Sequence, residues 1–275
     1  MGLIREPGAG GNFWPHHEAA VAKLIPDLEA EPEALAMILG GSLARGWGRA
    51  DSDIDGHLVI TEQAMAARME RDDLVYPRCE QHCDYEGGYF DLKCVTSSML
   101  EDAADRGSEP FRNSYVGAQV RWSRLDSPLD ELLARVTAYP EADHAEKVLT
   151  FACHLEGNKW FAIEAQKRDD PYLMAWSAQR AALFAGRLIL AHNRILFPYH
   201  KWLMRSVETA SEKPSGFVEA MDAAVRSPGV ETNHALADLA LGFQDWGKPA
   251  VGWWNDFIRE TEWAWRHGRC PVAER

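Results

Sequence analysis

Short apolar runs alternate with helical stretches over about the first 125 residues of the chain. Apolar runs bounded by glycine, serine or charged positions are typical of strands, and they predict strands at residues 35–39, 54–60, 88–96 and 119–123. Helical spacing predicts short helices at residues 42–46, 62–71 and 97–105, the last of them capped by Ser97. This part of the chain is therefore expected to form a sheet accompanied by helices.

Helical periodicity dominates the rest of the chain. Residues 124–133 (RLDSPLDELL) are predicted as a linker and helix start, with Ser127 as the N-cap and Pro128 at the first helical position. We therefore expect two domains, residues 1–125 and residues 126–275. Further helices are predicted at residues 142–168, 172–197, 199–209, 216–225, 232–243 and 251–266.

Composition and charge narrow the class of protein. The 275 residues are 46% hydrophobic and 26% charged, which is typical of a folded protein rather than a disordered one. The net charge of −13 would repel a phosphate backbone, which argues against a protein that coats nucleic acid. An acidic surface instead suits a cationic small molecule or a cationic protein as partner.

Apolar segments and cysteines indicate whether a protein enters a membrane and in which compartment it lies. The first residues lack the apolar segment of a secretion signal, and the most apolar stretch, residues 181–197, is interrupted by charged and polar side chains. Five cysteines without a framework spacing are typical of reduced thiols. We therefore expect no membrane span and a cytoplasmic location. Residues 6–17 are expected to form a flexible lead-in, although His16 and His17 could equally cover the mouth of a site.

Acidic residues gather on one face of the second and third predicted strands. Because side chains alternate across a strand, Asp53, Asp55 and His57 share a face, and Asp91 shares a face with Lys93. If the two strands are neighbours, three carboxylates converge, which is tolerable only when a divalent cation neutralises them. We expect these carboxylates to ligate Mg²⁺ that arrives with nucleotide phosphates, on a face left open. His57 and Lys93 would either contact the substrate or satisfy the carboxylates at the sheet edge.

A glycine-rich turn precedes the carboxylates. Gly40 and Gly41 end the first predicted strand, and Ser42 opens a short helix. Backbone N–H groups at a helix N-terminus after a tight turn form a cradle for an anion such as a triphosphate. Arg45, one turn further on, could add a charge-assisted contact to the same phosphates. We therefore predict that Gly41, Ser42 and Arg45 bind the nucleotide.

The order of these parts carries a resemblance to a known family. A Gly-Ser turn, an Asp-x-Asp motif ten residues later and a third Asp on a later strand resemble the nucleotidyltransferase superfamily of DNA polymerase beta. Within it, the chain is similar to small bacterial antibiotic nucleotidyltransferases of the kanamycin type. The matching motifs span about residues 38–93.

The resemblance implies a fold, a reaction and a role for each of the three aspartates. It implies an α+β fold, with a mixed nucleotidyltransferase sheet flanked by helices and then an all-helical C-terminal bundle. The implied reaction moves a nucleoside monophosphate from a triphosphate to an acceptor hydroxyl and releases pyrophosphate. Asp53 and Asp55 would hold both metal ions and Asp91 the catalytic one. Asp91, or a carboxylate of the helical domain, would take the proton.

The acceptor is open to more than one interpretation. The leading hypothesis is a small polar molecule such as an aminoglycoside antibiotic, modified with AMP from ATP, on the strength of fold analogy and acidic charge. The second is a protein-modifying or antitoxin-like adenylyltransferase that acts on a Tyr, Ser or Thr of a partner protein. The third is a silent nucleotide-binding module, against which the complete carboxylate set argues. The tryptophan-rich C-terminal end could serve a homodimer interface as well as a core.

The helical half offers candidates of its own. Lys201 is predicted to contact the triphosphate, because related enzymes often supply a basic residue from this region. The alternative is that this residue and its basic neighbours are paired with acidic ones. Glu156 is a candidate general base or, alternatively, a solvated helix residue. Arg187 and His192 have an R-x4-H spacing similar to that of helical ribonucleases often encoded beside minimal nucleotidyltransferases.

A cysteine and histidine cluster gives a further alternative. Cys79, His82, Cys83 and Cys94 could be read as zinc ligands. Their spacing matches no common closed zinc site, and Cys94 is expected on the apolar face of its strand. A zinc site is therefore the weaker interpretation of these residues.

Overall fold

The computed structural model describes residues 13–268, and the chain divides into two compact units, residues 1–138 (unit 1) and residues 139–275 (unit 2). The division follows helix α6 (Leu129–Thr137), which was expected to open the second domain. In the structure, Leu133 and Val136 of α6 belong to the same apolar core as Leu100 of helix α4 (Ser97–Arg106). That shared core keeps α6 with unit 1.

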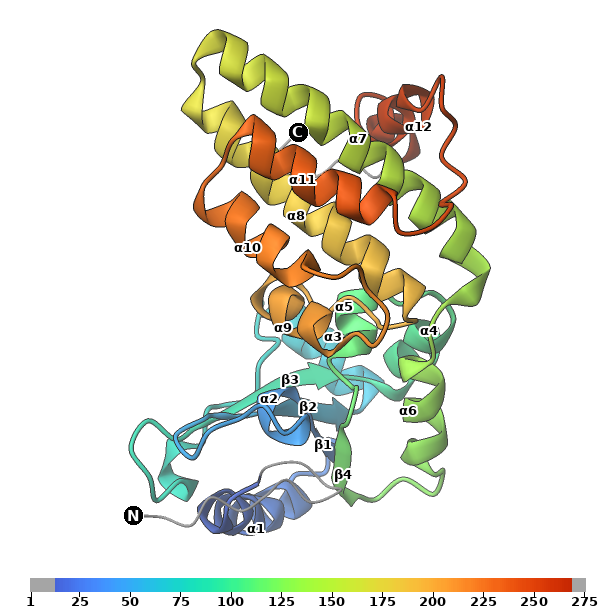
Figure 1. Ribbon diagram of the computed structural model, residues 1–275. Helices are drawn as coiled ribbons and strands as arrows, with labels where there is room; N and C mark the ends of the chain where they lie inside the picture. The colour runs from blue at the N-terminus through green and yellow to red at the C-terminus, as the bar shows by residue number, and fades with distance from the viewer. Residues whose placement is uncertain (1–12, 269–275) are drawn as a thin grey trace. The chain divides into compact units, whose positions relative to one another are not determined.

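Unit 1 is built on a four-stranded mixed sheet (Figure 1). The strands lie in the order β3-β2-β1-β4, where β1 pairs antiparallel with β2 and β4, and β2 pairs parallel with β3. The predicted mixed sheet is thereby confirmed, with β2 and β4 at their predicted bounds. The strands are β1 (Ala34–Leu39), β2 (Ile54–Ile60), β3 (Phe90–Val95) and β4 (Gln119–Ser123).

Helices cover both faces of this sheet. On one face, Leu58 and Leu92 pack with helix α1 (Pro15–Ala30) and helix α3 (Glu62–Glu70). On the other face, apolar residues of β1, β2 and β3 pack with α4, α6 and residues around α5 (Glu109–Asn113). The face that carries Asp55 is therefore not open along its length, contrary to expectation. Asp55 and Asp91 stay half-exposed on this face and Lys93 stays exposed, while the covering helices pack on the apolar residues.

Helix α1 was not predicted from the sequence. Pro15 begins the helix, which suits a residue that has no backbone N–H to leave unpaired, so the expected flexible lead-in is wrong for residues 15–17. Pro26 lies inside the helix and obscures its pattern, yet Leu24 and Leu28 are fully buried against the sheet. Residues 6–12 of the expected lead-in lie outside the described residues.

Two predicted helix caps are each displaced by one residue. Helix α4 is capped by Thr96, whose hydroxyl oxygen accepts a hydrogen bond from the Met99 backbone N–H at 3.2 Å, rather than by Ser97. Thr96 has the extended backbone that an N-cap needs, while Ser97 already lies inside the helix. Pro128, not Ser127, is the N-cap residue of α6, because its own backbone is extended.

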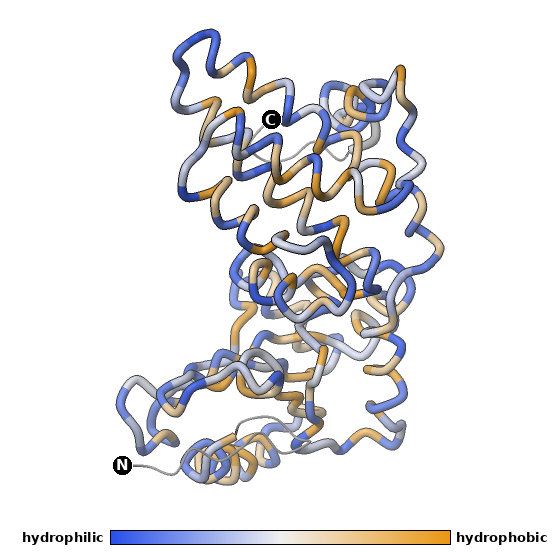
Figure 2. The backbone as a smooth tube through the Cα atoms, in the orientation of Figure 1, coloured by the Kyte–Doolittle hydropathy of each residue, from blue (hydrophilic) through white to orange (hydrophobic). Residues whose placement is uncertain are grey.

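Unit 2 is all-helical within its described residues, so the predicted α+β architecture is confirmed. Small residues such as Ala152, Ala181 and Ala185 are fully buried where the two longest helices pack together. Figure 2 shows polar and apolar positions alternating along these helices, as expected when one side faces a core. The helices are α7 (His144–Arg168), α8 (Pro171–His192), α9 (Leu203–Thr209), α10 (Phe217–Arg226), α11 (Val230–Leu241) and α12 (Trp254–Glu260). Of these, α7, α8, α9 and α12 are shorter than predicted, whereas α10 and α11 have the predicted length and are shifted by one and two residues.

The length and polarity of the helices decide whether any of them could span a membrane. Within residues 13–268, no helix is both long enough and apolar enough to cross a bilayer. Helix α8 has the most apolar sequence of the long helices, and it packs its buried residues into the core of unit 2.

Candidate active site

The register of the parallel strands places two carboxylates side by side. Asp55 on β2 is the direct partner of Asp91 on β3, and both side chains are half-buried. Neighbouring strands lie about 4.8 Å apart, so side chains at paired positions on one face are in reach of each other. Asp53 lies two residues before Asp55, in the loop that leads into β2, and is also half-buried. The strand neighbours on which the predicted convergence depended are thus present.

The glycine-rich turn packs directly on Asp55. Gly41, the first residue of the short helix α2 (Gly41–Ala44), has a positive φ of 64°. A Cβ atom at Gly41 would lie only 2.2 Å from Oδ2 of Asp55, so no larger residue fits there without a shift. The backbone N–H of Gly40 donates to the Asp55 carbonyl oxygen at 2.9 Å. The turn and the acidic motif predicted to share a site therefore touch.

Arg45 ends the same turn but is already engaged. Its guanidinium donates to the backbone oxygen and to the side-chain oxygen of Asn113, in helix α5. Burial lowers the pKa of Arg45 to about 10, which leaves the group charged at neutral pH. A phosphate contact would require Arg45 to share or leave these acceptors. Its predicted role in nucleotide binding stays a prediction.

Two of the carboxylates have nearby polar partners. Lys93 donates to Oδ2 of Asp91 at 3.3 Å, as one of the two predicted roles for Lys93 requires. A hydrogen bond with Asp53 raises the pKa of the Tyr89 hydroxyl. Asp91 and Asp53 therefore each have a polar side chain beside them.

Metal ligation can be tested against this arrangement. Among the described residues, no group of three or more His, Cys, Asp or Glu side chains is placed to hold a metal ion. A closed site made of Asp53, Asp55 and Asp91 is therefore not assembled. Mg²⁺, however, is commonly bound by one or two carboxylates together with substrate phosphates. The adjacent pair Asp55 and Asp91 fits an ion of that kind, completed by phosphate oxygens.

His57 occupies a buried position rather than the open edge that was expected. Its ring stacks on Tyr115 with centroids 4.2 Å apart, and only 5% of the residue is exposed. Burial, with a smaller effect of the Lys93 charge, lowers the pKa of His57 to about 3, so the imidazole is neutral. The expectation that His57 contacts substrate or lies at the sheet edge is wrong, because Tyr115 and Phe111 cover it.

The loop before Asp53 is held by residues far away in the sequence. The ring nitrogen Nε2 of His16 lies 2.7 Å from the Ala50 carbonyl oxygen, and Nε2 of His17 lies 3.2 Å from that of Ser52. The Tyr85 hydroxyl donates to the same Ser52 oxygen at 3.0 Å. The sequence suggested that the two histidines could cover a site. Nothing in the spacing indicated Tyr85, which comes from another loop.

The candidates in unit 2 are mostly paired. Glu156 lies 3.4 Å from Lys248 and 3.8 Å from Lys159, so it is neither an unpaired base nor simply solvated. His192 lies 2.9 Å from a carboxylate oxygen of Glu212, an ion pair when the imidazole is charged. Several basic residues of this region lie over aromatic rings: Arg187 over Phe151 and Phe197, Lys201 and Arg205 over Trp202. These cation–π contacts stabilise several of the basic side chains that were candidates from the sequence.

The cysteine and histidine cluster shows no zinc geometry in the described residues. His82 lies 2.8 Å from a carboxylate oxygen of Asp27, and Cys94 is buried in the core on the α1 side of the sheet, as its strand position predicts. The four described cysteines, Cys79, Cys83, Cys94 and Cys153, are free thiols.

Comparison with known proteins adds little to this geometry. No protein-family profile and no curated protein matches the chain. Among solved structures, a nucleotidyltransferase-like protein from Exiguobacterium sibiricum 255-15 is similar over 89% of this chain and 79% of that chain, with a TM-score of 0.45 and 11% sequence identity. A likeness that loose assigns no function.

Proposed function

We propose that the chain is a Mg²⁺-dependent nucleotidyltransferase that moves AMP from ATP to a hydroxyl of a small polar acceptor, such as an aminoglycoside. The observation that carries the proposal is the contact between Gly41 and Asp55, with Asp91 in register beside Asp55. A turn of backbone N–H groups and a pair of carboxylates at one point suit a phosphate chain and its divalent cation.

The chemistry of the proposed transfer follows from these side chains. The acceptor oxygen forms a bond to the α-phosphorus, the bond from that phosphorus to pyrophosphate breaks, and the acceptor proton passes to Asp91. Lys93 lies beside Asp91 and donates a hydrogen bond to its Oδ2. Asp53, Asp55 and Asp91 would hold Mg²⁺, which when bound neutralises charge on the phosphates.

The remaining binding residues are proposed for the phosphates. Gly41 and Ser42 would offer backbone N–H groups, while Arg45 and Lys201 would offer positive charge. Lys201 is exposed, so a phosphate can reach its ammonium group. The net charge of −13 supports a cationic acceptor.

The first test is the binding of the donor. Calorimetric titration with each nucleoside triphosphate, with and without Mg²⁺, should show Mg²⁺-dependent binding of ATP to the wild type and loss of that binding in Asp53→Asn. Asp51→Asn is the matched control, since Asp51 lies two residues earlier, is exposed and pairs with Arg49. Equal binding by Asp53→Asn and wild type would contradict the proposal.

The second test identifies the acceptor. Incubation with ATP, Mg²⁺ and a panel of aminoglycosides should add the mass of one AMP to at least one of them. Absence of any adduct would contradict the aminoglycoside assignment alone, provided that ATP binding is intact. AMP transfer to a protein in a lysate would instead favour a partner protein as the acceptor.

A further inference from the structure

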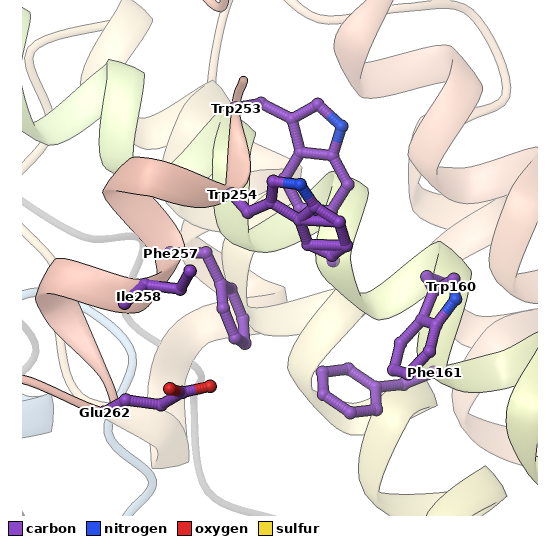
Figure 3. Close-up of a pocket in the computed structure, with 8 residues that line it drawn as sticks. Trp160, Phe161, Trp253, Trp254, Phe257, Ile258 and Glu262 are labelled. Carbon is purple, nitrogen blue, oxygen red and sulfur yellow. The ribbon is translucent and has the colours of Figure 1, made fainter. Parts of the chain in front are cut away.

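Helix α7 (His144–Arg168), helix α12 (Trp254–Glu260) and the residues that flank α12 line an open aromatic cavity of about 300 Å³ in unit 2. Figure 3 shows rings on both sides of it, with the Glu262 carboxylate directed toward the same space. The volume is that of a site for a small molecule, at the lower end of the usual range. The residues that line it are Gly157, Trp160, Phe161, Trp253, Trp254, Phe257, Ile258 and Glu262.

The walls of this cavity support one another. Trp160 and Phe161 meet edge to face at 5.0 Å between centroids, and Phe161 lies 5.9 Å from Phe257 across the two helices. Gly157 permits this approach, because a Cβ atom there would lie 3.1 Å from the Phe257 ring. These ring contacts hold the walls of the cavity against one another.

One carboxylate borders these rings. Within the described part of the chain, Glu262 has no hydrogen bond and no ion pair, and it is the one charged residue among those that line the cavity. Glu164 of the same unit, by contrast, pairs with Lys167 and Arg168. The cavity therefore combines aromatic faces with a negative charge that has no counterpart in residues 13–268.

We propose that this cavity binds a small organic cation, an ammonium group that carries apolar substituents. The faces of aromatic rings attract cations, and a carboxylate nearby adds to that attraction. The carboxylate at the cavity disfavours phosphates and other anions. This proposal stands on unit 2 alone and does not depend on the proposed transferase activity.

Choline and 3,3-dimethylbutan-1-ol, which replaces the charged nitrogen with carbon, are suitable probes of this cavity. In calorimetric titrations of the full chain we expect choline to bind at least about threefold more tightly than its neutral isostere, the range that cation–π attraction supplies. Indole N–H shifts in tryptophan-labelled protein should move for Trp160 and Trp254. Equal binding of the two probes, or no binding of choline, would overturn the proposal.

Two variants and two controls locate the effect. Glu262→Gln and Trp254→Leu should each weaken choline binding at least about threefold, and Glu262→Gln should leave the neutral isostere unaffected. Glu260→Gln and Trp263→Leu change residues of the same segment that do not line the cavity, and should bind like wild type. Circular dichroism checks that each variant is folded. Unchanged choline affinity in folded Glu262→Gln would refute the role of the carboxylate.

Discussion

The candidate carboxylates of units 1 and 2 have different surroundings. In unit 1, the strand register brings Asp55 against Asp91, so two like charges share a half-buried position with Lys93 as a nearby cation. In unit 2, a charge such as that of Glu156 lies between two lysines. A pair of like charges costs free energy unless a ligand neutralises it, whereas opposite charges need no ligand. Candidate chemistry is therefore better sought where the fold places like charges side by side than where opposite charges pair.

The largest expected effect tests this contrast directly. Asp55→Asn should lower the rate of AMP transfer by roughly 10³-fold or more, because it removes one of the paired carboxylates at the phosphates. Glu156→Gln, the matched change in unit 2, should leave transfer within about twofold of wild type. Both rates can be measured by release of pyrophosphate. Wild-type turnover in Asp55→Asn, or a collapse in Glu156→Gln, would reverse the assignment of roles to the two units.

Two glycines, Gly41 in unit 1 and Gly216 in unit 2, give the next largest expected effect. Gly41→Ala places a methyl group against the Asp55 carboxylate and should weaken ATP binding roughly 100-fold, measured by calorimetry. Gly216 in unit 2 has a similar φ of 74°, but a Cβ atom there would have no other atom within 4 Å. Gly216→Ala should therefore lose about 1 kcal/mol of unfolding free energy from backbone strain, and no ATP affinity. Equal ATP binding by the two variants would show that the contact with Asp55 has no role in the site.

A substitution at Lys201 tests whether unit 2 contributes to binding of the phosphates. Lys201→Met should weaken ATP binding roughly tenfold, through loss of one positive charge at the phosphates. The control is Lys213→Met, since Lys213 donates to the Glu208 carbonyl oxygen at 3.0 Å and serves the end of a helix. This control should change stability rather than affinity. If Lys201→Met binds ATP like wild type, the phosphates are held without that residue.

The smallest expected effect is a loss of folding stability at acidic pH. Burial, aided by the nearby Arg180 charge, lowers the pKa of His154 to about 4, below its usual value of about 6.5. As pH falls through 6.5 the unfolded chain binds a proton that the folded chain refuses, so stability decreases. Between pH 7 and pH 5.5 the loss from this residue is about 1 kcal/mol.

His154→Gln is the variant that checks this effect. Urea unfolding at the two pH values should show a loss that is smaller by about 1 kcal/mol in His154→Gln than in wild type. Imidazole C–H shifts should also stay unchanged for His154 above about pH 5 in the wild type. An equal pH dependence in both proteins would mean that His154 is protonated in the folded chain as readily as in the unfolded one.

Local patterns in the sequence were enough for much of the fold. Short bounded apolar runs predicted β2 and β4 at their observed bounds. Alternation also placed Asp55 and Asp91 on faces that could meet. Their meeting itself depended on which strands are neighbours, and the parallel pairing of β2 with β3 supplies that condition.

Contacts between residues far apart in the sequence could not be predicted from local sequence patterns. His57 was expected near the substrate, and it is Tyr115, from a segment more than fifty residues later, that buries it. Helix α1 was missed because Pro26 interrupts its spacing, although the packing of Leu24 and Leu28 on the sheet overrides that cost. Burial and pairing are products of the whole fold, so they correct expectations that rest on single elements.

The order of strands in unit 1 has a consequence for synthesis on the ribosome. β1 and β2 are made first and pair with each other, but β1 also needs β4, which ends at Ser123, and its second face needs α6, which ends at Thr137. Apolar residues such as Ile38 and Val59 therefore stay uncovered on that face until about half of the chain has been translated. During this interval the nascent chain presents a surface suited to chaperones, and slow translation of residues 60–137 would prolong it.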